Sequence, residues 1–159
     1  MYNYDEIVPN LYVGNQKTLT EAKFNLVINC SLNIPEISEY SCRSIKLAIR
    51  DDPVDSDKLY SLLRHYKVLE EIHEYLNEAN KSVLVYCNMG IQSSPAIAGC
   101  YLIKYYNMTP EESINFIRTK RPIAFFGKIN FINLLNKVYS DRVNALSVFD
   151  SLPNSCETP

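Results

Sequence analysis

The chain of 159 residues lacks several features that would place it in common functional classes. It has no dense block of Lys and Arg and a net charge of −2, so an electrostatic surface for nucleic acid is not indicated. Its longest apolar runs are too short to cross a membrane, and its N-terminus does not resemble a signal peptide. We therefore expect an intracellular protein of the cytoplasm or nucleus, with neither a membrane nor a nucleic acid as partner.

The chain also lacks the residue spacing of a metal site. Its 5 cysteines are odd in number and are not spaced like zinc ligands, which favours free thiols in a reducing compartment. They are Cys30, Cys42, Cys87, Cys100 and Cys156. His65 and His73 lie on one expected helix without a third ligand, so we interpret both as surface residues. We expect no metal and no cofactor.

Glycine is scarce, with only 4 residues, whereas Asn, Ile, Lys and Tyr are abundant. Such a bias is typical of an AT-rich genome and suggests a viral or protist source. With 47% apolar residues, the length fits one continuous core and hence one domain, which we place at residues 1–143. Residues 144–159 are rich in Ser, Pro and Asn towards their end, and we expect a flexible C-terminal tail there.

Hydrophobic periodicity predicts an α/β fold. Buried or alternating strands are expected over residues 7–13, 25–30, 44–49 and 83–86. Helices are expected over residues 59–80, 95–106, 110–120 and 128–139. The order strand, long helix, buried strand forms a βαβ unit with parallel pairing. We therefore predict a central, mostly parallel sheet flanked by helices.

The most informative segment connects the last predicted strand to the next helix. A β-branched strand over residues 83–86 runs into Cys87, a short turn with Gly90, and a helix start at Ser94-Pro95. This arrangement presents a thiolate and a ring of backbone N–H groups to a phosphate. Cys87 as a small buried hydrophobe is the alternative interpretation.

The segment resembles the signature of cysteine-dependent protein phosphatases, H-C-x-x-G-x-x-R-[ST]. The chain keeps the cysteine as Cys87, the glycine as Gly90 and the final hydroxyl as Ser94. It departs from the signature at Tyr86, which replaces the histidine, and at Ser93, which replaces the arginine. The phosphate-binding loop would comprise Cys87, Asn88, Met89, Gly90, Ile91, Gln92 and Ser93.

Further motifs in the same order are similar to those of the dual-specificity phosphatase family, over roughly residues 4–140. Residues 7–14 (IVPNLYVG), 27–31 (VINCS) and 47–53 (LAIRDDP) match the family's opening strand, a core strand and the general-acid segment. Arg121-Pro122 resembles the motif near the end of the domain.

The resemblance implies roles for particular residues. Cys87 would be the nucleophile, Asp51 the general acid and Ser94 the hydroxyl that stabilises the thiolate. Asp52 is the alternative acid, and Asp51 could equally be one acid among several in a solvated loop.

Ser93 bears most directly on activity. A guanidinium donates two parallel charge-assisted hydrogen bonds to phosphoryl oxygens, and a serine hydroxyl is too short and uncharged to replace it. Arginines that stabilise phosphoryl transfer contribute about 10³–10⁵ in rate, or roughly 4–7 kcal/mol of barrier. Arg50, Arg118 or Arg121 would have to reach the loop from another segment to compensate.

The sequence therefore predicts a pseudophosphatase that binds a phosphoprotein, an active kinase or an active phosphatase as competitor or scaffold. One alternative is a low-activity phosphatase of phosphotyrosine, phosphoserine and phosphothreonine, acting through a phosphocysteine at Cys87. RNA 5′-phosphate hydrolysis is a third, which the acidic balance disfavours. Ser93 could also be an engineered change, although Tyr86 favours natural divergence of the loop.

Overall fold

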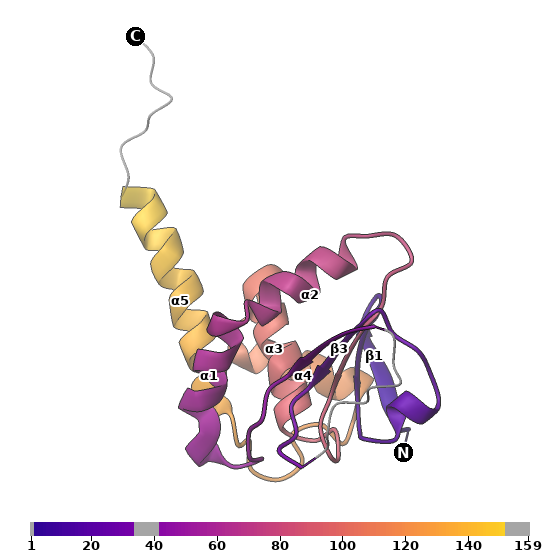
Figure 1. Cartoon of the computed structure of the whole chain (residues 1–159). Coiled ribbons are helices and arrows are strands. Elements are labelled where there is room, and N and C mark those ends of the chain that lie inside the picture. The colour runs from indigo at the N-terminus through magenta and orange to yellow at the C-terminus, as the bar shows by residue number, and fades with distance from the viewer. Residues whose placement is uncertain (1, 34–41, 152–159) are drawn as a thin grey trace.

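A computed structural model describes residues 2–33 and 42–151 of the chain (Figure 1). The strands are β1 (Tyr4–Val8), β2 (Leu11–Gly14), β3 (Leu26–Asn29), β4 (Arg43–Lys46) and β5 (Val83–Tyr86). The α-helices are α1 (Ser56–His65), α2 (Val68–Leu76), α3 (Ser93–Tyr105), α4 (Pro110–Lys120) and α5 (Ile132–Ser151). Two short 3-10 helices are η1 (Thr18–Thr20) and η2 (Pro53–Asp55).

The strands form one sheet in the order β1-β2-β5-β3-β4. β1 pairs with β2 antiparallel, and all other pairs are parallel. Every residue of β5 is buried, as expected for a strand covered on both faces. The predicted central, mostly parallel sheet flanked by helices is confirmed.

The two faces of the sheet are covered unequally. All five α-helices contribute to the larger core, and Figure 1 shows α1, α2, α3 and α5 on one side of the sheet. A smaller cluster of Phe24, Val27, Leu84 and Tyr86 lies apart from that core, next to η1 residue Leu19. α3 is buried from Ser93 to Ile103, which explains why its sequence is apolar nearly all round.

The helix predicted before β5 is divided in two. α1 ends at His65 and α2 begins at Val68, because Lys67 adopts a left-handed conformation with φ 50°. The stripe from Leu59 to Ile72 keeps its spacing because both helices bury their apolar side against the same core. The periodicity therefore predicted the buried face correctly but did not indicate the break between α1 and α2.

The first predicted strand is likewise two strands. Asn10, with φ 69°, forms a tight turn between β1 and β2, and Val8 pairs with Leu11. Asn tolerates this conformation better than most residues, so the turn needs no glycine. The strand expected over 44–49 is shorter than predicted and ends at Lys46.

The last helix differs most from expectation. We predicted a helix over 128–139 and a tail from residue 144, but α5 runs from Ile132 to Ser151. The predicted tail is therefore helical up to Ser151, because residues 140–151 contain neither Gly nor Pro to end the helix. Residues 152–159, with Cys156, lie outside the described residues. The end of the domain at residue 143 stays a prediction.

The start of α4 is as predicted. The Thr109 side chain accepts a hydrogen bond from the Glu112 backbone N–H (3.2 Å), and the Glu112 carboxylate accepts one from the Thr109 N–H (3.0 Å). This capping box satisfies two backbone donors that the helix itself leaves unpaired. Over the described residues, no helix has both the length and the apolar character to span a membrane.

Candidate active site

The loop after β5 lies at the carboxyl end of the central strand, the edge where open α/β sheets place their ligand sites. Cys87 follows β5 directly, and α3 begins at Ser93. Gly90 has φ 67°, and a Cβ there would lie 2.6 Å from Arg121 Nη2 and 2.8 Å from the Gly14 carbonyl oxygen. The turn therefore requires glycine for both conformation and space.

The Cys87 sulfur is surrounded by donors. The Gly90 N–H points at it from 3.3 Å, and the Ser94 hydroxyl lies 3.1 Å away. The pKa of Cys87 is well below that of a free thiol because of hydrogen bonds from Cys30, Ser93 and Ser94, although burial acts in the opposite direction. A thiolate is thus favoured at a position that is only 4% exposed.

Cys30 is a neighbour that the sequence did not reveal. β3 and β5 are adjacent, and Asn29 lies opposite Tyr86, so the residues that follow, Cys30 and Cys87, meet at the sheet edge. Burial first, and then Cys87, raise the pKa of Cys30 well above that of a free thiol, so Cys30 stays protonated. Its sulfur also donates to the Tyr86 carbonyl (2.9 Å). Since a thiol has one proton, the Tyr86 carbonyl and the Cys87 thiolate compete for it.

Ser93 and Ser94 both serve the thiolate. Ser93 is 1% exposed and its hydroxyl is among the donors that lower the pKa of Cys87. The Ser94 hydroxyl lies 3.4 Å from the Gly14 carbonyl oxygen as well as against Cys87. Where the family signature has a guanidinium, this chain has a second hydroxyl, which supplies a hydrogen bond and no positive charge.

A cavity of about 170 Å³ opens above Cys87. It is lined by Cys30, Ser31, Leu32, Asn33, Ile49, Arg50, Asp51, Cys87, Asn88 and Ser93. The volume suits one small anion better than a drug-sized ligand, which occupies roughly 300–1,000 Å³.

Asp51, and not Asp52, is among the residues that line this cavity. Desolvation first, and then the charge of Cys87, raise the pKa of Asp51 to about 6, against an opposing hydrogen bond from Asn130. Asp52 instead caps η2 by accepting the Val54 N–H (2.9 Å). The structure thus brings Asp51 and Cys87 together and gives Asp52 a separate structural task.

The three arginines considered as replacements differ in position. Arg121 is fully buried behind the loop, where it donates to the Gly90 carbonyl (2.8 Å) and to Asp5 (2.7 Å). Arg118 donates to two backbone carbonyls outside the loop. Arg50 lines the cavity.

The other departure from the signature, Tyr86, and the loop residue Gln92 are both accommodated locally. Tyr86 is 2% exposed, and its ring packs in the smaller hydrophobic cluster with Phe24. Gln92 donates to the carbonyls of Phe126 (3.1 Å) and Lys128 (2.8 Å), and its oxygen accepts from the Asn130 N–H (3.1 Å). The Gln92 side chain therefore braces the loop against the segment before α5.

The histidines and Cys100 lie away from this cavity. His73 is half-buried, its Nδ1 lies 3.0 Å from the Tyr101 hydroxyl, and its ring stacks on Tyr105, which corrects its interpretation as a surface residue. His65 is exposed and contacts Tyr66. Cys100 is fully buried, and burial raises the pKa of its thiol, as in a packing residue. Among the described residues, no group of three or more His, Cys, Asp or Glu could hold a metal ion.

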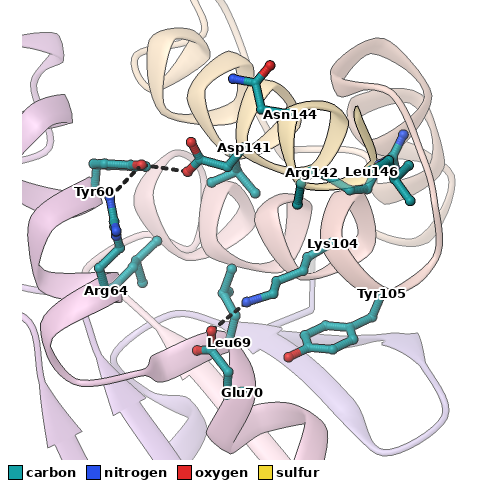
Figure 2. Close-up of a pocket in the computed structure, with 13 residues that line it drawn as sticks. Tyr60, Arg64, Leu69, Glu70, Lys104, Tyr105, Asp141, Arg142, Asn144 and Leu146 are labelled. Atoms are coloured by element: carbon teal, nitrogen blue, oxygen red, sulfur yellow. Dashed lines mark hydrogen bonds and ion pairs between the residues drawn. The ribbon is translucent and has the colours of Figure 1, made fainter. Parts of the chain in front are cut away.

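A larger hollow of about 780 Å³ lies elsewhere, bounded by α1, α2, α3 and α5 (Figure 2). Figure 2 shows Tyr60 and Arg64 of α1, Glu70 of α2 and Lys104 of α3 around it, with α5 above. None of its lining residues belongs to the loop that carries Cys87. Its size alone therefore does not make it the site of chemistry.

Comparison with known proteins identifies the family of the chain. The family model of the dual specificity phosphatase catalytic domain matches residues 11–141. The chain therefore belongs to the dual-specificity phosphatase family.

Among curated relatives, the 123R protein of Invertebrate iridescent virus 6, which carries a tyrosine phosphatase name, is 32% identical over 76% of this chain and 81% of its own length. The tyrosine-protein phosphatase vhp-1 of Caenorhabditis elegans is 27% identical over 81% of this chain. The match spans only 20% of vhp-1 and 31% of human dual specificity protein phosphatase 5.

Solved structures share the fold at low sequence identity. Human DUSP28 superposes with a TM-score of 0.75 at 20% identity, covering 89% of this chain and 95% of its own. The human tyrosine phosphatase-like serine/threonine/tyrosine-interacting protein superposes with a TM-score of 0.67 at 19% identity, covering 91% and 97%.

Proposed function

We propose that this protein is a pseudophosphatase that binds a phosphorylated protein partner, such as a kinase or the substrate of an active phosphatase, and acts as competitor or scaffold. The observation that carries the proposal is Ser93, a buried hydroxyl at the position where the signature has its arginine. The loop turn at Gly90 and the donors around Cys87 are present, so weak phosphate binding is retained while the charge that drives turnover is missing.

Exposed apolar side chains near the cavity support a protein partner. Leu32 lines the cavity, Met89 belongs to the loop, and the Phe126 carbonyl accepts a hydrogen bond from Gln92. Their exposures are 47%, 56% and 73%. Large exposed apolar groups beside a polar pocket are typical of surfaces that contact another protein. One structural neighbour also carries the name of an interacting protein that is phosphatase-like.

We place this activity inside the cell, because the four cysteines among the described residues are free thiols. Three of them are buried, and Cys87 needs a reduced sulfur to keep its hydrogen bonds to the loop.

The test is hydrolysis of an aryl phosphate by the wild-type protein beside Ser93→Arg. We expect wild-type kcat/KM at least about a thousandfold below that of an active family member, from the contribution of the arginine. A wild-type value within about tenfold of such an enzyme, a gap of only about 1.4 kcal/mol in barrier, would contradict the proposal.

A second candidate function, slow hydrolysis of phosphoproteins, is favoured by the pair of Cys87 and Asp51. In that reaction the Cys87 thiolate forms a bond to phosphorus while the phosphorus–oxygen bond breaks, and Asp51 gives its proton to the leaving oxygen. Water then gives a proton to Asp51 and forms a bond to phosphorus while the sulfur–phosphorus bond breaks, which releases phosphate and restores the Cys87 thiolate. The lowered pKa of Cys87 and the raised pKa of Asp51, about 6, suit these two roles. Cys87→Ser, which removes the nucleophile, separates slow turnover from contamination.

A further inference from the structure

We infer that Arg50 contacts the phosphate group of a bound phosphoprotein, in place of the arginine that the loop lacks. This inference rests on the proposed function, since it names the residue by which the same site holds its phosphorylated partner. It concerns binding, and Arg50 is assigned no part in a chemical step.

The position of Arg50 is the first argument. Among the described residues that line the cavity above Cys87, Arg50 is the only Lys or Arg. It directly precedes Asp51, whose carboxyl interacts with the charge of Cys87, so this stretch of chain passes beside the sulfur. The Arg50 side chain is 62% exposed and thus accessible to a ligand that enters from solvent.

The second argument is the way Asp55 holds the guanidinium. Arg50 Nε and Nη2 lie 3.3 Å and 3.0 Å from the Asp55 carboxylate, which also accepts the Arg50 backbone N–H (2.7 Å). The Asp55 side chain is only 7% exposed, so the anchor is fixed within the protein while the arginine faces outwards. These bonds use two of the five N–H donors of a guanidinium, and the others can donate to a phosphate.

The third argument is the charge of the cavity. The Cys87 thiolate and Asp51 both disfavour a phosphate dianion, and the loop amides with the start of α3 supply only partial positive charge. Arg118 and Arg121 donate to backbone carbonyls or to Asp5 instead. Arg50 carries a formal positive charge, which Ser93 does not, although the Asp55 carboxylate balances part of it.

The experiment measures binding of a phosphotyrosine peptide and of inorganic phosphate at pH 6 to six proteins. They are the wild type, Arg50→Ala, Arg50→Lys, Arg64→Ala, Ser93→Arg and the combination of Arg50→Ala with Ser93→Arg. Arg64→Ala is the matched control, because it removes the same charge from an exposed position on α1 that does not line the cavity. Thermal unfolding verifies that each variant is folded.

We expect Arg50→Ala to lower the affinity for both ligands about tenfold or more, which is the loss typical of a hydrogen bond to a charged group. The affinity of Arg50→Lys should lie between those of the wild type and Arg50→Ala, since lysine keeps the charge and loses the planar set of donors. Arg64→Ala should stay within about twofold of wild type, as exposed charges far from a ligand contribute little. In the presence of Ser93→Arg, the Arg50→Ala change should lower the affinity less than about threefold, because the two guanidinium groups bind the same phosphate.

Wild-type binding that Arg50→Ala retains would overturn the inference and leave the proposed function intact. Equal losses in Arg50→Ala and Arg64→Ala would also overturn it, by showing a general effect of net charge. If the wild type binds neither ligand, the inference fails together with the phosphate-dependent part of the proposed function. Should Arg50→Ala not fold, the comparison of Arg50→Lys with wild type decides, and equal affinities there would count against the inference.

Discussion

Single side chains determine what the loop can do, and two exchanges separate it from the family signature. Ser93 supplies a hydrogen bond to Cys87 in place of a cation, and Tyr86 fills the smaller hydrophobic cluster where the signature has a histidine. Cys87 and Asp51 line the cavity, and Gly90 forms the turn of the loop. The loop therefore lacks charge while retaining its shape.

The charge that is missing at position 93 can be restored by substitution. Ser93→Arg should recover oxyanion binding clearly and turnover only in part, since errors near 1 Å in placement can cost about a hundredfold. Tyr86→His combined with Ser93→Arg should recover more turnover than either change alone. A double-mutant cycle on aryl phosphate hydrolysis, with tungstate binding in parallel, measures both effects. If the double variant binds oxyanion well yet stays inert, the assigned role of Asp51 is the first to be doubted.

The pKa of Cys87 should depend on its neighbouring donors. Ser94→Ala removes a hydroxyl 3.1 Å from the sulfur, so the pKa should rise and alkylation by iodoacetamide should shift to higher pH. Cys30→Ala should act in the same direction. Ser61→Ala, at an exposed position of α1, is the control and should leave the profile unchanged. An unchanged profile in Cys30→Ala would show that the Cys30 thiol donates its hydrogen bond to the Tyr86 carbonyl and not to Cys87.

The raised pKa of Asp51 predicts how turnover depends on pH. A general acid acts only while protonated, and a pKa of about 6 for Asp51 extends the protonated form above the usual range of a carboxyl. Turnover by the combined Tyr86→His and Ser93→Arg variant should therefore fall as the pH rises above about 6. Asp51→Asn should abolish this descending limb and Asp52→Asn should preserve it. If Asp52→Asn abolishes the descending limb and Asp51→Asn preserves it, Asp52 is the acid.

At the scale of elements, the sequence indicated which faces are buried better than where each element ends. The buried faces of the helices and the capping box of Thr109 follow from periodicity and from local hydrogen bonding, and these were predicted correctly. The break at Lys67 depends on one residue with positive φ that is neither Gly, Asn nor Pro, so residue type did not indicate it. The turn at Asn10 did have a local signal, because Pro9 followed by Asn10 is a pair that favours a turn. The neighbourhood of Cys30 and Cys87 depends on strand order, which lies beyond local pattern.

The break between α1 and α2 can be tested by stability. Lys67 has φ 50°, a conformation that costs an L-residue roughly 1–2 kcal/mol and a glycine little. Lys67→Gly should therefore stabilise the protein, by about 0.5–1 kcal/mol after the greater chain entropy of glycine is counted. Lys58→Gly, the same change inside α1, should destabilise it by up to about 1 kcal/mol. Urea unfolding measures both, and destabilisation by both changes would place Lys67 in an ordinary helical conformation.

For the whole molecule, the order of motifs along the chain predicted the architecture, because a strand, a loop and a helix in the order of β5, the Cys87 loop and α3 are typical of a parallel α/β sheet. The extent of α5 was not predictable in the same way. Leu135 and Val138 are buried and mark the part of the helix that belongs to the core. Residues 143–147 are all exposed, and the composition after Arg142 is compatible with a helix, so no hydrophobic pattern in the sequence indicated where the helix ends.

This difference gives a prediction about truncation. A chain ending at residue 143 removes the end of α5, including Leu146, which is 56% exposed beside the larger hollow (Figure 2). Because residues 144–147 are exposed, the loss in unfolding free energy relative to a chain ending at residue 151 should be at most about 1 kcal/mol. Tungstate binding should be equal in the two chains, since the hollow shares no residue with the cavity above Cys87. Urea unfolding and tungstate titration provide the comparison. A loss of about 3 kcal/mol or more, the cost of removing a core side chain, would extend the domain to the end of α5.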